Sequence, residues 1–165
     1  MAARALAALA AYAGGVDDRA LVAGQIGREP RAFRQVVVRC PFGFPAVTEQ
    51  APLDETGNPF PTTYWLTCRH LVAAVSRVEA AGGVERWTDA VRADPELAAS
   101  LERANEQQRA LTGLGIGGSS RGGSLKCLHA HVAYALARPD YELGQRIVAE
   151  LEPVWPSGHC CSERG

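Results

Sequence analysis

Residues 113–131 read GLGIGGSSRGGSLKCLHAH, and the other elements of the chain are expected to be arranged around this stretch. Six of its first eleven residues are glycine. Because glycine adopts backbone conformations that other residues avoid, a run of this density predicts a loop. Ser124 is placed to cap a following helix over about 125–137, which Pro139 ends. The stretch therefore predicts a glycine-rich loop that leads directly into a helix.

The predicted helix carries a thiol and two imidazoles near its start. Cys127 and His131 are four residues apart, so a helix places both on one face, while His129 points elsewhere. The first turn of a helix offers N–H groups and the positive end of the dipole, which favour a thiolate at Cys127. The structural alternative is that Cys127 is a small buried residue and His131 a histidine with satisfied hydrogen bonds. A nucleotide-binding loop is disfavoured, because no Ser or Thr follows Lys126.

The composition indicates one globular domain. The 165 residues are 47% hydrophobic and 21% charged, which is ordinary for a folded protein with a sizeable core. We expect residues 16–161 to form this domain, with a low-complexity segment at 1–15 and a tail at 162–165. The net charge of −1 and the dispersed arginines argue against a nucleic-acid partner. No apolar run reaches the ~18 residues that a membrane span needs, so membrane insertion is not expected.

The start of the chain, MAARALAALAAYAGG, is rich in alanine but lacks the strong apolar block of a secretory signal. We therefore expect a cytoplasmic protein. Thiols stay reduced in that compartment, so the five cysteines of the chain favour metal binding or catalysis over disulfides.

The N-terminal half has strand-like segments separated by turns, whereas the C-terminal half has helical periodicity. The β-branched run at 33–39 and the segments 46–51 and 62–67 predict three strands. Apolar residues three or four apart predict helices that end at glycine or proline. The expected fold class is α+β, with a small three-stranded antiparallel sheet in the N-terminal half packed against four or five helices. The helical segments cover about 17–24, 68–81, 84–93, 95–111, 125–137 and 141–151.

The remaining cysteines occupy positions that suit metal ligands. Cys40 lies in the turn CPFGFP, which resembles the tight knuckles that present a thiolate to a metal. Cys68 opens a predicted helix with Thr67 as its cap, and the segment 157–161 is expected to return to the body of the protein. We therefore expect zinc or an iron–sulfur cluster to be bound by four thiolates, with His131 as a substitute ligand. The expected thiolates are Cys40, Cys68, Cys127 and one of Cys160 and Cys161.

Two other classes of function stay open. In a thiol enzyme, Cys127 is the nucleophile, His131 or His129 is the base, and the glycine-rich loop offers N–H groups to an oxyanion. Such an enzyme requires a carboxylate to orient the histidine, and none lies nearby in the sequence. A non-enzymatic interaction module is the third possibility, and an exposed apolar patch with scattered, buried thiols is its expected mark.

Three motifs resemble one known family: CPFGFP at 40–45, NPFPTTYWLTC at 58–68 and KCLH at 126–129. In this order they resemble the domain of unknown function 501 family of actinobacteria and other bacteria, over about residues 18–161. The resemblance implies no established activity, but neighbouring genes associate the family with septum formation, so a protein partner in cell division is possible. It also implies that the position of Cys68 holds Cys or His, an exchange that a metal ligand tolerates.

Overall fold

The computed structural model describes residues 17–119 and 125–160, and it contains a three-stranded antiparallel sheet in the N-terminal half. The strands are β1 (Phe33–Arg39), β2 (Pro45–Gln50) and β3 (Tyr64–Leu66), in the order β1-β2-β3. The register between β1 and β2 shifts at several points, and the last pair joins Arg39 to Pro45. The predicted sheet is thus confirmed, and its longest strand is the β-branched one.

Helices make up most of the rest of the described chain, so the predicted α+β class is confirmed. None of them is both long enough and apolar enough to cross a membrane. Asp94 shows how the sequence sets a boundary, because its side chain accepts hydrogen bonds from the N–H groups of Glu96 and Leu97 at the start of one helix. The described helices are α2 (Asp18–Ile26), α3 (Arg69–Ala80), α4 (Gly83–Ala93), α5 (Pro95–Thr112), α6 (Leu128–Ala137) and α7 (Glu142–Val148), with a short 3-10 turn η1 (Ile116–Gly118).

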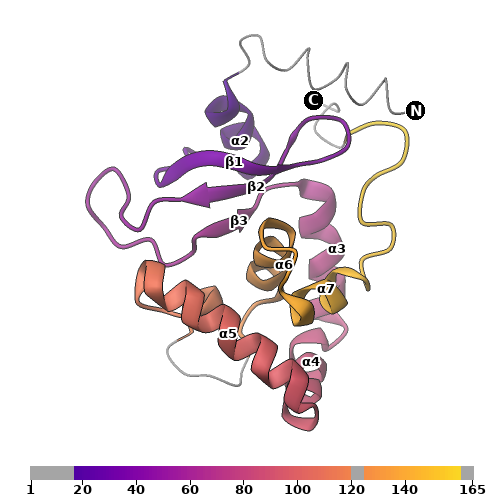
Figure 1. Cartoon of the computed structure of the whole chain (residues 1–165). Helices are drawn as coiled ribbons and strands as arrows, with labels where there is room; N and C mark the ends of the chain where they lie inside the picture. The colour runs from indigo at the N-terminus through magenta and orange to yellow at the C-terminus, as the bar shows by residue number, and fades with distance from the viewer. Residues whose placement is uncertain (1–16, 120–124, 161–165) are drawn as a thin grey trace.

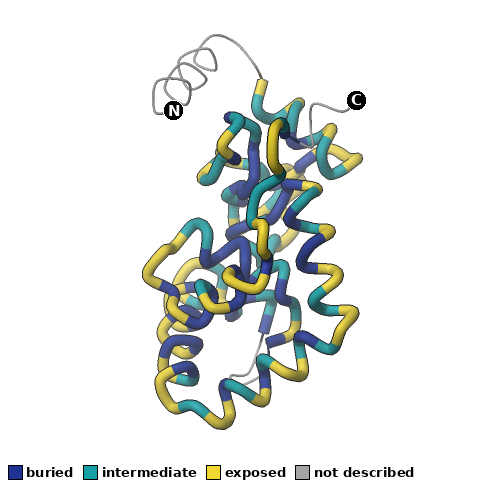
Figure 2. Tube along the Cα trace, turned by 90° about the vertical axis from the view of Figure 1, so that its right-hand side faces the viewer, coloured by how far each residue is buried: buried dark blue, intermediate teal, exposed yellow. Residues whose placement is uncertain are grey.

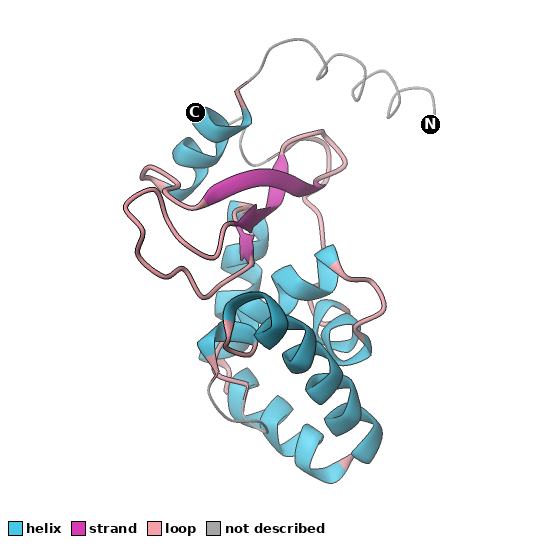
Figure 3. Cartoon of the chain, turned by 60° about the vertical axis from the view of Figure 1, so that its left-hand side comes forward, coloured by secondary structure: helices cyan, strands magenta, loops and turns pink. Residues whose placement is uncertain are grey.

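The sheet lies toward one end of the molecule and most of the helices lie toward the other (Figure 3). Helix α6 is central: it packs against β3 and also contacts β1, β2, α3, α7 and η1 (Figure 1). Its sequence is apolar on nearly every side, which is typical of a helix enclosed by other elements. Figure 2 shows buried positions running through the middle of the trace and exposed positions on its outer turns. The core is therefore built around α6, which is also the helix of the KCLH motif.

Two helices start later than predicted. α6 begins at Leu128, and Cys127 precedes it as an extended residue with φ −150°. The cap of α6 comes from another element, since the N–H of Leu128 donates a 2.8 Å hydrogen bond to Glu79 Oε1 in α3. The predicted cap Ser124 lies outside the described residues. Similarly, α3 begins after Cys68 and not after the predicted cap Thr67.

The C-terminal segment after α7 returns to the sheet, as predicted, over the described residues up to Cys160. It runs beside α3 toward the turn between β1 and β2 (Figure 1). His70 Nε2 in α3 lies 3.0 Å from the carbonyl oxygen of Pro153, and Trp155 packs against the core. At its end, Cys160 is buried against Cys40. The segment thereby links α7 to the far end of the sheet.

Candidate metal centre

Helices α3 and α6 bring together a carboxylate, a thiol and an imidazole. Glu79 lies in the last turn of α3, Cys127 immediately before α6, and His129 in the first turn of α6. One ligand atom from each residue lies within 4.8 Å of the other two, the one such group of three among the described residues. His129 Nδ1 lies 3.2 Å from Glu79 Oε1 and 3.8 Å from Cys127 Sγ. Residues about 50 positions apart thus form one compact cluster.

The other nitrogen of His129 is held by α3. His129 Nε2 lies 3.2 Å from the carbonyl oxygen of Val72 and 3.2 Å from Ser76 Oγ. Ser76 Oγ itself donates to the same carbonyl at 2.8 Å. A carbonyl oxygen can only accept, so Nε2 carries a proton whether the ring is neutral or charged. The ring is thereby oriented with Nδ1 toward Glu79 and Cys127.

The electrostatics of the cluster favour a charged pair. The hydrogen bond with Cys127 raises the pKa of His129 to about 9 against the effect of partial burial, and the charge of Glu79 adds to the rise. Partial burial by itself would raise the pKa of Cys127. The contact with His129 and the backbone N–H of Ala130 outweigh it, so the pKa of Cys127 is lowered. Both shifts therefore favour a thiolate at Cys127 beside an imidazolium at His129.

The cluster is half-buried and has a glycine beside it. The side chains of His129 and Glu79 are 26% and 27% exposed, so solvent reaches the site. Gly117 in η1 has φ +70°, and a Cβ there would lie 3.9 Å from Cys127 Cβ and 3.7 Å from Ala130 Cβ. A positive φ of this size favours glycine. The described part of the glycine-rich loop therefore packs against the cluster.

The predicted site residues lie at separate places in the structure. Cys40 Sγ and Cys160 Sγ lie 3.7 Å apart at the β1–β2 turn, and Cys68 is buried at the start of α3. Cys127 lies with His129 at the other end of α3, so the structure does not join the predicted thiolates into one set of four. Cys161 lies outside the described residues and stays a prediction.

His131 does not face Cys127. Its Nδ1 lies 2.8 Å from the hydroxyl of Tyr141, and its side chain is buried. Burial lowers the pKa of His131 to about 4, so the ring is neutral. The predicted shared face fails because Cys127 precedes the helix and is extended. His131 has the surroundings of a core histidine.

Sequence reasoning missed Glu79. The residue is remote from Cys127 in the chain, and only the packing of α3 against α6 brings the two together. One signal was present: a carboxylate in the last turn of a helix faces the negative end of the helix dipole. A glutamate at such an unfavourable position indicates that its charge has a partner elsewhere.

Comparison with known proteins identifies the family of the chain. A family model described as "Protein of unknown function (DUF501)" matches residues 36–111 and 100–149. These ranges include Cys40, Cys68, Glu79, Cys127 and His129. No curated protein and no solved structure matches the chain. The matched ranges span well over half of the sequence, and the chain belongs to the DUF501 family.

Proposed function

We propose that this protein binds a zinc ion through Glu79 Oε1, Cys127 Sγ and His129 Nδ1. The observation that carries the proposal is the mutual distance of these atoms. Ligands bound to tetrahedral zinc at their usual lengths lie about 3.4–3.6 Å from one another. The contacts of His129 Nδ1, 3.2 Å to Glu79 and 3.8 Å to Cys127, lie on either side of that range. Small side-chain rotations would be enough to seat the ion.

The hydrogen bonds around the cluster support a metal site. A histidine that binds zinc usually donates its other ring N–H to a carbonyl or carboxylate, and His129 Nε2 faces the Val72 carbonyl in this way. A ligating carboxylate is usually fixed by a hydrogen bond as well, and Glu79 Oε1 accepts the N–H of Leu128. Both ligands are thus oriented before an ion arrives.

The charges also fit a divalent cation. The cluster contains two groups that become anions, and a proton on His129 Nδ1 lies between them when no metal is bound. Zinc would replace this proton, since a ligating imidazole is neutral and a ligating cysteine is a thiolate. A cluster with one sulfur is a poor match for iron–sulfur ligation, which uses several thiolates.

Three protein ligands leave one coordination position open. Structural zinc sites are closed by four protein ligands, whereas catalytic sites keep one position for water or substrate. The partial exposure of Glu79 and His129 leaves the cluster accessible to solvent. We therefore propose a zinc site of the open type, in which Glu79, Cys127 and His129 would hold the ion and the ion would supply Lewis-acid activation of water.

A thiol enzyme is the second candidate, because the pKa of Cys127 is lowered and a histidine and a carboxylate lie beside it. In the usual triad, the acid and the nucleophile bind opposite nitrogens of the histidine. Here Nδ1 faces both Cys127 and Glu79, while Nε2 is held by Val72. The geometry therefore favours a metal. A protein partner linked to cell division and a cytoplasmic location stay predictions.

The test is the zinc content of protein purified anaerobically without a metal-affinity tag. We expect Cys127→Ser and His129→Ala each to lower the zinc content by about one equivalent per chain, because three ligands are too few to spare one. His70→Ala is the matched control, since this histidine lies in α3 and its ring pairs with the Pro153 carbonyl, away from the Glu79 cluster. Folded variants that keep the full zinc content would contradict the proposal and return Cys127 to tests of thiol reactivity.

A further inference from the structure

A second pair of chemically reactive side chains lies at the opposite end of α3. Cys40 follows β1 directly, and Cys160 ends the described C-terminal segment, 120 residues later in the chain. Their sulfur atoms are 3.7 Å apart. The two residues are 5% and 1% exposed, so the pair is enclosed by protein. This pair shares no residue with the proposed zinc site.

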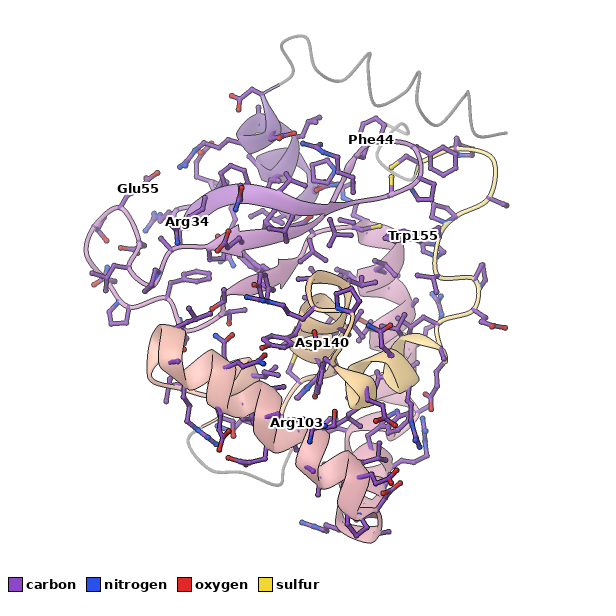
Figure 4. The ribbon with its side chains drawn as sticks, in the orientation of Figure 1. Arg34, Phe44, Glu55, Arg103, Asp140 and Trp155 are labelled. Atoms are coloured by element: carbon purple, nitrogen blue, oxygen red, sulfur yellow. The ribbon has the colours of Figure 1, made fainter. Side chains whose placement is uncertain are left out.

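The turn between β1 and β2 holds the Cys40 thiol in place. The N–H of Cys40 donates to the carbonyl of Phe44, and the N–H of Gly43 donates to the carbonyl of Cys40, both at 2.9 Å. Gly43 has φ +89°, which favours glycine at this point of the turn. Figure 4 shows Phe44 in this turn and Trp155 on the C-terminal segment beside α3. These two hydrogen bonds fix the backbone of the turn that carries the Cys40 side chain.

The separation of the two sulfurs excludes a disulfide and suits a shared metal ion. Sulfurs joined by a disulfide are about 2.05 Å apart. Two thiolates bound at about 2.3 Å to one tetrahedral ion lie about 3.8 Å apart. At 3.7 Å the thiol of Cys40 donates a hydrogen bond to Cys160 Sγ, and nearly the same spacing would suit two thiolates on one ion. Thiolates buried at this place would need a compensating cation, which zinc would supply.

A third thiol lies at the same end of the sheet. Cys68 is 1% exposed and its N–H points to the carbonyl of Ala46, 3.4 Å away. Ala46 follows Pro45, the residue paired with Arg39, which immediately precedes Cys40. Cys68 is also the N-cap residue of α3, and no side chain caps that helix start, so its N–H groups favour a thiolate. The three sulfurs do not all lie within 4.8 Å of one another, so Cys68 would have to turn inward to complete the set.

We propose that Cys40 and Cys160, with Cys68 as the third thiolate, bind a second zinc ion. This ion would fasten the C-terminal segment to the β1–β2 turn and to the start of α3. Its three ligands are buried and all sulfur, as in structural zinc sites, although a closed structural site has one ligand more. Zinc displaces the thiol protons, so no oxidant or reductant takes part.

The experiment counts zinc per chain in protein purified anaerobically without a metal-affinity tag. We expect about two equivalents in the wild type, of which Cys160→Ser and Cys40→Ser each lose one. Cys127→Ser should lose the other equivalent and keep this one, so each site serves as the control for the other. Cys68→Ser should behave like Cys160→Ser. Cobalt in place of zinc adds a spectroscopic check, because the thiolate-to-cobalt absorption of the Cys127→Ser protein should persist.

The wild-type protein alone provides a measurement that does not depend on how the variants fold. An organomercurial that binds thiols should release two equivalents of zinc to a coloured chelator. One equivalent of zinc in the wild type that is unchanged in Cys160→Ser and lost in Cys127→Ser would overturn the second site. So would an intact mass lower by two hydrogens with a Cys40–Cys160 disulfide after purification under argon. If zinc disappears in Cys160→Ser but is unchanged in Cys127→Ser, the second site stands and the first proposal fails.

Discussion

The two ends of α3 present cysteines in opposite surroundings. At the C-terminal end, Cys127 is half-buried and meets a histidine and a carboxylate. At the N-terminal end, the sulfurs of Cys40 and Cys160 meet in a buried place. The first group has mixed donors and reaches solvent, whereas the second is all sulfur and buried. The two kinds of cysteine site cannot be told apart by residue type, but they differ in burial and in the donor atoms beside the sulfur.

The difference indicates that ions at the two ends of α3 would have different roles. An ion in a buried thiolate site mainly adds folding free energy, since its ligands converge only in the folded chain. In an open site with a carboxylate and an imidazole among its ligands, one coordination position of the ion is left for an exchangeable ligand such as water. The two proposals therefore differ in what removal of the ion should do, and stability and pH measurements can separate them.

The largest expected effect is on stability. We expect Cys160→Ser to lower the free energy of unfolding of the zinc-loaded protein by about 4 kcal/mol, the linkage contribution of a ligand at about 1,000 times its dissociation constant. Cys127→Ser should cost less than half of this, because Glu79 still caps α6. Urea unfolding of both variants measures the difference. Equal losses in the two variants would contradict the division between a structural and an open site.

The two histidines of α6 make the comparison sharper. His129 faces acceptors on both nitrogens, whereas His131, two residues later, is fully enclosed and contacts Tyr141. Burial depresses the pKa of His131 to about 4, below the value of about 6.5 in an unfolded chain. Between these values the unfolded state binds more protons, so folding stability falls as the pH is lowered.

From pH 7 to pH 5, His131 should therefore reduce the free energy of unfolding by about 2 kcal/mol. The comparison is with His131→Gln, which keeps a polar group for Tyr141 but does not titrate. Urea unfolding of both proteins at pH 7 and pH 5, in excess chelator, measures how much free energy of unfolding each loses on acidification. If the two proteins lose the same stability on acidification, His131 is not held neutral by burial.

Zinc affinity at the Glu79 site should rise with pH. His129 has a pKa of about 9 without metal, and zinc must displace the proton on Nδ1. Below pH 9 the apparent affinity should therefore increase about tenfold per pH unit. Competition with a fluorescent zinc indicator on Cys160→Ser protein isolates this site. A flat profile between pH 7 and pH 8 would mean that His129 Nδ1 is not a ligand.

Much of the fold follows from local sequence, and the site follows only in part. The run of β-branched residues at 36–38 predicts β1, and Asp94 with the proline after it predicts the start of α5, because these signals act within a few residues. The thiol at the start of α6 was also predicted as a site residue. Each of these inferences needs no knowledge of which elements pack together.

The partners of Cys127 depend on packing. Glu79 reaches the site only because α3 lies against α6, and its carboxylate caps α6 so that the helix starts at Leu128. A shift of the helix start by three residues leaves His131 out and brings His129 in. The histidine that accompanies the thiol thus depends on contacts between α3 and α6, such as the hydrogen bond from Leu128 to Glu79, which no spacing rule contains.

The smallest expected effect concerns the glycine-rich loop. Gly117→Ala should cost about 1–2 kcal/mol, because φ +70° disfavours any residue with a Cβ. Gly118→Ala is the matched control: its φ is +74°, but a Cβ there would have no atom within 4 Å. The two variants should therefore lose similar stability in urea, and only Gly117→Ala should also alter zinc affinity, by less than about tenfold, since its new methyl group meets Cys127 and Ala130 at ordinary contact distance. An equal change of affinity in both would show that the loop acts through its backbone and not through this contact.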